Sequence, residues 1–278
     1  MCQYSCEGGF ATEIIGRDDF SRLAEFDALF IRQTTHVNHF TYRFARRAAT
    51  EGLAVVDDPE SILKCTNKVY LAELLARQQI SIPRTIIVHR GNIASVGRRL
   101  GFPCILKLPD ASFSKGVVKV DDEQSLEQKV KEFLAQSDLV VAQEFVPTSF
   151  DWRVGVWDRQ PLFACRYHMA KDHWQIIKRD KAGRRFEGHV EDVPLDEAPP
   201  AVVETALAAA NLIGEGLYGV DLKEIDGRAC VIEINDNPNI DAGHEDQGLK
   251  DDLYRRIVSG FARRIERSRN EVPAVAGN

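Results

Sequence analysis

The chain has 278 residues, of which 44% are hydrophobic and 28% are charged, and its formal net charge is −6. This length suits one large domain or two ordinary ones, and the composition is that of a globular protein with a buried core. The negative charge disfavours general nucleic-acid binding, and no window approaches the roughly 18 apolar residues of a membrane span.

The cysteines indicate a reducing compartment. Six of them are scattered along the chain without a CxxC pair, and Cys104, Cys165 and Cys230 stand inside apolar runs. Such thiols are typical of reduced core residues. The first residues have neither the basic start nor the apolar centre of a signal peptide. We therefore expect a cytoplasmic protein, and the composition leaves the oligomeric state open.

The first part of the chain predicts a small α/β unit. Residues 25–32 indicate a buried strand, residues 37–52 a helix, and residues 53–58 a second strand that ends before Pro59. A strand, a helix and a strand in this order form one βαβ unit. One such unit is too small for a complete doubly wound domain.

The middle of the chain predicts strands and helices of mixed order. Residues 66–80 carry apolar side chains near helical spacing and predict a helix. Three short apolar runs beyond it predict strands at 103–109, 116–120 and 139–146, with a helix at 122–137 between the last two.

The last part of the chain predicts hairpins and two helices. Residues 152–179 alternate in hairpin fashion, and residues 199–214 form a helix with Pro at its start and Gly at its end. Residues 218–235 predict two strands joined by a turn at Asp226-Gly227. Residues 249–268 predict a basic amphipathic helix.

The stretch VIEINDNPNID, residues 231–241, concentrates oxygen-bearing side chains directly after a strand-like run. Its spacing fails as a calcium loop, which needs Gly at the sixth position and Glu at the twelfth. A polar turn and a magnesium site both remain as interpretations, because Asn, Asp and Pro also favour turns for local hydrogen-bonding reasons.

The register of the hairpin determines whether these side chains converge. Glu233 and Asn235 share a face because side chains alternate along a strand. A three-residue turn at 226–228 sets Asp221 directly opposite Glu233, whereas a two-residue turn puts it on the other face. The first register collects two carboxylates and an amide, which are oxygen ligands suited to Mg²⁺ and poor ligands for zinc.

Several lysines have positions at which they would meet a nucleotide. Lys107 lies in an otherwise apolar strand, where a lone lysine is costly unless an anion contacts it. The loop 111–116 after that strand has small residues whose backbone N–H groups can approach phosphates, although a plain hairpin with a solvated Lys115 has the same pattern. Lys68 opens a helix, a position that equally suits a surface lysine.

Familiar catalytic motifs are missing from the sequence. It has no GxxxxGK[ST] loop, no GxGxxG after a strand, no HExxH and no GxSxG. Its seven histidines show no paired metal-ligand spacing, so zinc is not expected.

In their order along the chain the candidate residues resemble the ATP-grasp superfamily, and its RimK-like branch of amino-acid and peptide ligases most of all. The resemblance covers about residues 60–265 and rests on Lys68, Lys107, the loop 111–116, QEFV at 143–146, Asp151-x-Arg153, Arg166, Asp221 and EINDNPN.

This resemblance implies an α+β architecture, the ATP-grasp fold. Two α+β subdomains, residues 63–146 and 147–270, would clasp ATP between them. A short Rossmann-like segment, residues 1–62, would precede them, and residues 271–278 would form a flexible tail.

The resemblance also implies roles for single residues. Asp221, Glu233 and Asn235 would hold Mg²⁺, with Mn²⁺ as an alternative, against the phosphates of ATP. Arg153, Arg166 and Lys107 would be catalytic and would neutralise the transferred phosphoryl group. The implied nucleotide-binding residues are Lys68, Lys107, Ser112, Ser114, Lys115, Gly116, Gln143, Glu144, Phe145, Val146 and Asp151.

The implied activity is ATP-dependent ligation of a carboxylate to an amino-acid or peptide amine through an acyl phosphate, with glutamate addition to a peptide or protein as one form. A non-catalytic ATP-binding regulatory module and a kinase of a small acid are the alternatives. Residues 173–192 depart from the wording of the RimK-like branch, so the sequence does not identify the acid or the amine. Nucleic acid and membrane are not expected partners.

Overall fold

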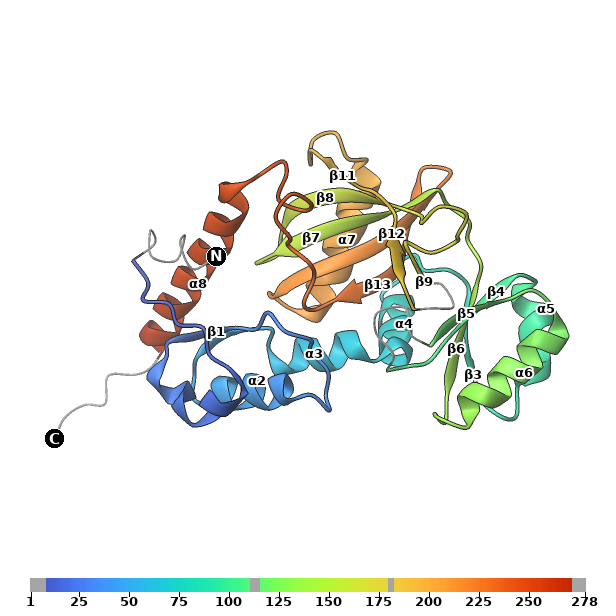
Figure 1. The fold of residues 1–278 in the computed structure, drawn as a ribbon, viewed down its shortest axis with the longest axis horizontal. Coiled ribbons are helices and arrows are strands. Elements are labelled where there is room, and N and C mark those ends of the chain that lie inside the picture. The colour runs from blue at the N-terminus through green and yellow to red at the C-terminus, as the bar shows by residue number, and fades with distance from the viewer. Residues whose placement is uncertain (1–8, 111–115, 180–182, 272–278) are drawn as a thin grey trace.

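The computed structural model describes residues 9–110, 116–179 and 183–271 (Figure 1). Within these ranges the chain forms a four-stranded sheet, a five-stranded sheet and two two-stranded pairings. Helices and sheets are mixed, which confirms the predicted α+β class. The elements in chain order are η1 (Arg17–Glu25), β1 (Ala28–Phe30), α2 (Phe40–Thr50), β2 (Ala54–Val56), α3 (Pro59–Thr66), α4 (Lys68–Arg77), β3 (Thr85–Val88), η2 (Ile93–Ser95), α5 (Val96–Leu100), β4 (Cys104–Lys107), β5 (Val117–Val120), α6 (Glu123–Leu134), β6 (Val140–Glu144), β7 (Phe150–Trp157), β8 (Gln160–His168), β9 (Ile177–Arg179), β10 (Arg185–Glu187), β11 (Val190–Val193), α7 (Pro200–Ile213), β12 (Leu217–Ile225), β13 (Arg228–Asn235) and α8 (Asp251–Glu271).

The βαβ unit predicted at the start of the chain is present, and we call β1, α2 and β2 the N-terminal unit. β1 pairs in parallel with β2. α2 covers the pair with Ala45 and Ala48, both fully buried beside Ile62 of α3. β2 also contacts α8, so the two ends of the described chain pack together.

Two capped helices, α3 and α4, lead from the N-terminal unit to the sheets. The second strand ends before Pro59, as predicted, and Pro59 is the first residue of α3, where its missing N–H has no helical partner to lose. Asn67 caps α4 by accepting from the amides of Val69 and Tyr70, each over 3.0 Å. The cap makes Lys68 the first helical residue.

The four-stranded sheet has the antiparallel order β3–β6–β4–β5, and α5 and α6 cover one of its faces (Figure 1). Leu106 and Ala142 point into the core under these helices. Lys107 and Gln143 belong to the other face because neighbouring side chains alternate along a strand. This uncovered face is the one that bounds the candidate site.

The five-stranded sheet has the antiparallel order β11–β8–β7–β12–β13, and its two faces have different partners. α7, which lies behind the sheet in Figure 1, packs its alanines against Trp152, Val220 and Leu222. Cys165 and Leu217 on the opposite face share a core with α8 and with Val56 of the N-terminal unit. Full burial of each large apolar side chain contributes about 1.5–3 kcal/mol to folding.

The cysteines behave as the composition indicated. Cys65, Cys104, Cys165 and Cys230 are buried and unpaired by disulfides. Burial raises the pKa of the Cys104 thiol to about 11, which leaves it protonated at neutral pH. Among the described helices, none combines the length and the apolar character that crossing a membrane requires.

Candidate active site

The three predicted metal ligands lie together on one face of the β12–β13 hairpin. Asp221 pairs directly with Glu233, and Asn235 follows two residues later in the same strand. Nδ2 of Asn235 donates to Oδ2 of Asp221 over 3.1 Å. The hairpin therefore presents two carboxylates and an amide as a compact set of oxygen ligands.

The hairpin reaches this register by a route that the sequence did not predict. The turn consists of Asp226 and Gly227, as predicted, with φ values of 50° and 73°, so the three-residue alternative does not form. A two-residue turn by itself would place Asp221 on the other face. A β-bulge leaves Ile232 as an extra residue in β13 and brings Asp221 opposite Glu233.

Each carboxylate of the set is paired with a cation from another element. Nζ of Lys68 lies 3.0 Å from Oε1 of Glu233. Arg153 binds Asp221 through two parallel hydrogen bonds, of 2.6 Å from Nε and 2.8 Å from Nη2. Burial raises the pKa of Glu233, but the charges of Lys68 and Lys107 outweigh this effect and lower it. The Glu233 carboxylate is therefore ionised at neutral pH.

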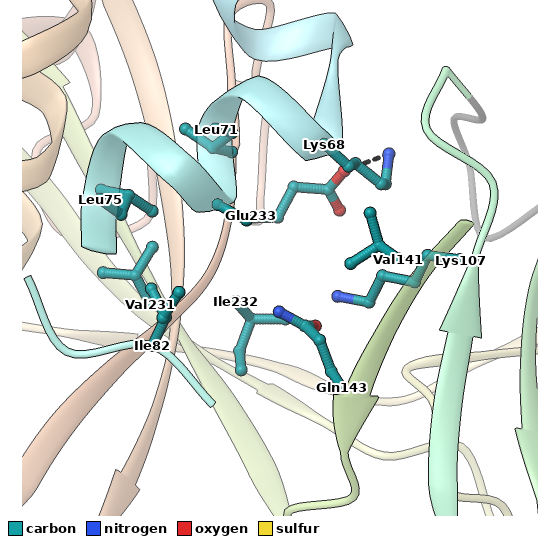
Figure 2. Close-up of a pocket in the computed structure, with 11 residues that line it drawn as sticks. Lys68, Leu71, Leu75, Ile82, Lys107, Val141, Gln143, Val231, Ile232 and Glu233 are labelled. Atoms are coloured by element: carbon teal, nitrogen blue, oxygen red, sulfur yellow. Dashed lines mark ion pairs between the residues drawn. The ribbon is translucent and has the colours of Figure 1, made fainter. Parts of the chain in front are cut away.

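A pocket opens beside the Lys68–Glu233 pair, between α4, β13 and the uncovered face of the four-stranded sheet. We call it the central pocket. In Figure 2, Lys68 and Glu233 stand on one side of it and Lys107 and Gln143 on the other. Its lining residues are Lys68, Leu71, Ala72, Leu75, Ile82, Lys107, Val141, Gln143, Val231, Ile232 and Glu233. An apolar slot with a few convergent polar groups is the usual form of a small-molecule site.

Lys107 is the most deeply buried cation of the central pocket, with 9% of the residue exposed. Burial lowers its pKa to about 8, while Glu233 raises it and Lys68 lowers it again. A buried ammonium needs a compensating anion. The sequence predicted such an anion for a lone lysine in an apolar strand, and the central pocket provides a place for it.

The predicted adenine-binding stretch, residues 143–146, divides between the pocket and its rim. Gln143 lines the pocket and donates to Oγ1 of Thr85 over 3.0 Å. The carboxylate of Glu144 accepts instead from the backbone N and the Nε of Arg84, over 2.8 and 2.6 Å. Glu144 is thus held by an ion pair that the sequence did not reveal.

The last two residues of this stretch lie outside the lining of the central pocket. The ring of Phe145 meets Trp174 edge to face with 6.0 Å between centroids, and Nζ of Lys119 lies 5.2 Å from the Phe145 centroid. Val146 is half-buried. Trp174 was not among the predicted site residues, because its contact with Phe145 depends on the path of a long connection.

Asp151 and Arg153 share the face of Asp221, as strand alternation predicts. Oδ1 of Asp151 accepts from Nζ of Lys223 over 2.5 Å and from Thr148 over 3.1 Å. Lys223, only 13% exposed at its side chain, is a charged residue that the sequence analysis missed. Its position two residues after Asp221 in the same strand was the available signal.

Arg166 lies on the opposite face of the sheet from Arg153. It pairs with Trp152 in the β7–β8 register, and Trp152 directly precedes Arg153 in its strand. Its guanidinium stacks 4.8 Å from the Trp152 ring and donates to Glu191 over 3.1 Å. The structure therefore does not bring Arg166 together with Asp221, and the joint role predicted for the two arginines does not fit this arrangement.

The predicted phosphate loop is only partly within the described residues. Gly116 has a φ of 69°, which favours glycine, and its carbonyl accepts from the amide of Leu108 over 2.9 Å. Ser112, Ser114 and Lys115 lie outside the described residues.

The family model of the RimK-like ATP-grasp domain matches residues 65–258. The chain belongs to the RimK-like ATP-grasp family. A probable alpha-L-glutamate ligase of Vibrio vulnificus is 26% identical over 223 residues, which cover 79% of this chain and 71% of that protein. The alpha-aminoadipate–LysW ligase LysX of Saccharolobus solfataricus is 25% identical over 233 residues, with coverages of 81% and 80%.

Solved structures show the same fold. A D-alanine–D-alanine ligase from Bacillus anthracis superposes with a TM-score of 0.72 at 17% identity, covering 94% of this chain and 86% of that one. A RimK domain protein from Sphaerobacter thermophilus gives a TM-score of 0.64 at 18% identity, with coverages of 84% and 81%. The predicted ATP-grasp fold is confirmed, and by family the chain is an ATP-binding enzyme of the ligase class.

Proposed function

We propose that this RimK-like chain is an ATP- and Mg²⁺-dependent carboxylate–amine ligase that forms an amide bond through an acyl phosphate. The observation that carries the proposal is that Asp221, Glu233 and Asn235 share one face of the hairpin, where Glu233 pairs with Lys68 and lines the central pocket together with Lys68 and Lys107. Since relatives named above are ligases of glutamate and of aminoadipate, an amino acid is the favoured amine.

The three ligands fit Mg²⁺. Two are carboxylates and one is an amide, and Glu233 is kept ionised by its lysine neighbours. Within the described ranges, no group of three or more His, Cys, Asp and Glu side chains is arranged to hold a metal ion. Mg²⁺ suits such an incomplete set, because it is usually held by one or two carboxylates together with substrate phosphates. When bound it would neutralise phosphate charge, and Mn²⁺ accepts the same oxygen ligands.

The cations of the chain supply the remaining positive charge. Lys68 and Lys107 act in a partly desolvated pocket, where attraction to phosphate oxygens is stronger than in water. The N–H of Lys68 donates to the carbonyl of Pro109 over 3.0 Å, which fixes the start of α4 near the end of β4. Arg153 holds Asp221 in place and stacks 4.6 Å from the Tyr167 ring centroid. These contacts pre-organise the site before substrates bind.

The chemistry requires no covalent protein nucleophile. A carboxylate oxygen of the acid attacks the γ-phosphorus of ATP, and the bond from that phosphorus to the β,γ-bridging oxygen breaks to release ADP. The nitrogen of a neutral amine then attacks the acyl carbon, phosphate leaves, and the nitrogen loses a proton to give the amide. Phosphoryl transfer of this kind depends chiefly on positioning and charge neutralisation.

The proposal is tested by incubating the full chain with Mg-ATP and pairs of acids and amines, including glutamate and short peptides. Mass spectrometry reads the mass of the acceptor, and a coupled assay reads ADP. We expect ADP release that depends on both substrates, together with the mass gain of a condensation product.

Two other results would select the alternatives. ADP release with a phosphorylated acid and no dependence on the amine would indicate a kinase. ATP binding without ADP release for any pair would indicate a regulatory module.

A further inference from the structure

A second pocket lies beside Glu233 and Asn235, and the N-terminal part of the chain forms one of its walls. Thr35 and His36, from the loop after β1, line it together with Asp236 at the end of β13. Lys68 and Glu233 line both this pocket and the central pocket, so the two are contiguous. A group bound in the second pocket would therefore lie next to phosphates bound in the first.

Hydrogen bonds join the segment after β1 to the turn after β13. Arg32 donates to Oδ1 of Asn237 over 2.6 Å and to the carbonyl of Pro238 over 2.8 Å. The Asn237 amide donates in return to the carbonyl of Gln33 over 2.7 Å. These hydrogen bonds therefore hold together two segments beside the second pocket that are more than 200 positions apart in the sequence.

Two buried carboxylates at this place have oxygens without a hydrogen-bond partner among the described residues. Asp236 lines the pocket and is 8% exposed, while Asp57 is 1% exposed, and Oδ2 is the unpartnered atom in both. Burial raises the pKa of Asp57, and the charge of Asp236 raises it further. The Asp236 carboxylate does accept a hydrogen bond from the Thr35 side chain, but a buried carboxylate oxygen without a partner, such as Oδ2, is unfavourable and points to a missing partner.

The nearby cations have other partners. Lys68 pairs with Glu233 at 3.0 Å, and the hydrogen bonds of the Arg32 guanidinium go to the turn at 237–238. Asp110 contributes a further carboxylate at the exposed rim. The lining has three carboxylates, on Asp110, Glu233 and Asp236, and one lysine, so its charge favours a cation.

We propose that this second pocket, named here the amine pocket, binds the ammonium group of an amino-acid substrate through Asp236, with the buried carboxyl group of Asp57 as a second polar partner. An ammonium is a compact cation with three N–H donors and no acceptor, so it offers what the Asp236 oxygen lacks. Docking here places the nitrogen beside Glu233 and Asn235, where the proposed function activates the acid. The bound ammonium must first lose one proton to water, which gives the neutral amine that attacks the acyl carbon. The inference rests on the proposed function for the role of the ligand as amine substrate.

A competing explanation needs no ligand. Asp57 and Asp236 would share one proton, as neighbouring carboxylates do when like charges cannot both be ionised. In that case a neutral side chain at position 236 would leave amino-acid binding unchanged.

Calorimetric titration of the full chain, with Mg²⁺ and a non-hydrolysable ATP analogue present, separates the two explanations. The probes are the twenty standard L-amino acids and the N-acetyl derivatives of those that bind. We expect at least one amino acid to bind, and its N-acetyl derivative, which has no ammonium, to bind at least tenfold more weakly.

The decisive variant is Asp236→Asn, which removes the charge and keeps the shape. We expect it to weaken amino-acid binding at least tenfold and to change the affinity for the Mg²⁺–ATP analogue less than twofold, which also shows that the neighbouring metal ligands are intact. Asp196→Asn is the matched control, because Asp196 is exposed and lines neither pocket. Asp57→Asn is the second variant, with an expected loss of threefold or more.

The proposal is overturned if no amino acid binds, if the N-acetyl derivative binds equally well, or if Asp236→Asn binds as tightly as the unaltered chain. Its failure is distinct from failure of the proposed function. Amino-acid binding that depends on Asp236, without ADP release for any substrate pair, would keep the amine pocket and reject the ligase. ADP release that requires both acid and amine but is insensitive to Asp236→Asn would keep the ligase and reject the amine pocket.

Discussion

Lys107 differs from the other cations of the site in lacking a carboxylate partner among the described residues. Lys68, Arg153 and Lys223 each have a carboxylate oxygen within 3.0 Å. Lys107 is instead buried near Glu233, whose carboxylate is already paired with Lys68. Its protonated form therefore lowers the stability of the unliganded protein while preparing the central pocket for phosphate.

The burial of Lys107 without an ion-pair partner predicts a pH dependence of the free energy of unfolding. Burial lowers the pKa of Lys107 from 10.5 to about 8, so between these values the unfolded chain binds more protons than the folded one. Stability must then rise as pH rises through this window, and below about pH 8 the destabilisation is fully present. Urea unfolding without nucleotide, at pH 7.5 and pH 9.5, should show the increase in the unaltered chain. Lys107→Met should reduce it, whereas Lys129→Met on the exposed side of α6 should not.

The same substitution tests the proposed role of Lys107. Because Lys107→Met removes a charge from the central pocket, we expect the KM for ATP to rise at least tenfold while the thermal midpoint does not fall. A variant with an unchanged KM for ATP would remove Lys107 from the nucleotide site.

Among the elements, the β12–β13 hairpin shows which part of the site the sequence could predict. Alternation along a strand predicted that Glu233 and Asn235 share one face of β13 and that Asp151 and Arg153 share one face of β7. Both predictions are confirmed, because the direction of a side chain along a strand is a local property. The predicted turn at Asp226-Gly227 is present, but the sequence linked the pairing of Asp221 with Glu233 to a three-residue turn, because the bulge at Ile232 has no signature in the sequence. The sequence did not predict that Arg166 and Arg153 lie on opposite faces, because no face was assigned to the second strand of their hairpin.

The turn itself is open to test. Gly227 has a φ of 73°, which L-residues adopt only with strain, so Gly227→Ala should lower the free energy of unfolding by about 1 kcal/mol. Asp226→Asn should be neutral within about 0.5 kcal/mol, because Asn tolerates positive φ. Urea unfolding curves compare the two variants. Equal stability of Gly227→Ala and the unaltered chain would argue against the two-residue turn.

For the molecule as a whole, the order of strands and the meeting of distant segments were beyond prediction. In the order β3–β6–β4–β5, the pairings of β6 with β3 and with β4 join strands separated by helices, and β3 is too short to stand out. Arg32 meets Asn237 across 205 positions, and no local pattern encodes such a contact. The N-terminal unit was predicted as a βαβ element, but its contribution to a pocket came only from the folded arrangement.

Arg32 should therefore be the residue that attaches the segment after β1 to the turn at 237–238. Arg32→Ala removes two hydrogen bonds from a charged donor, each of which contributes about 1.5–3 kcal/mol. We expect faster amide hydrogen exchange at 236–241 and in β1, with unchanged affinity for the ATP analogue. Arg46→Ala, at an exposed position of α2, is the control. Unchanged exchange at 236–241 in Arg32→Ala would mean that other contacts hold these two segments together.

The central claim is that the face of β12 and β13 forms a catalytic metal site, and Glu233→Gln tests it most directly. The matched control is Glu215→Gln, since Glu215 is also ion-paired and its side chain is 39% exposed against 32% for Glu233, but it lies outside both pockets. With Mg-ATP and the substrate pair that gives ADP, we predict at least a hundredfold lower rate for Glu233→Gln, a native-like thermal transition, and an unaffected rate for Glu215→Gln. Undiminished ADP formation by a folded Glu233→Gln variant would contradict the account.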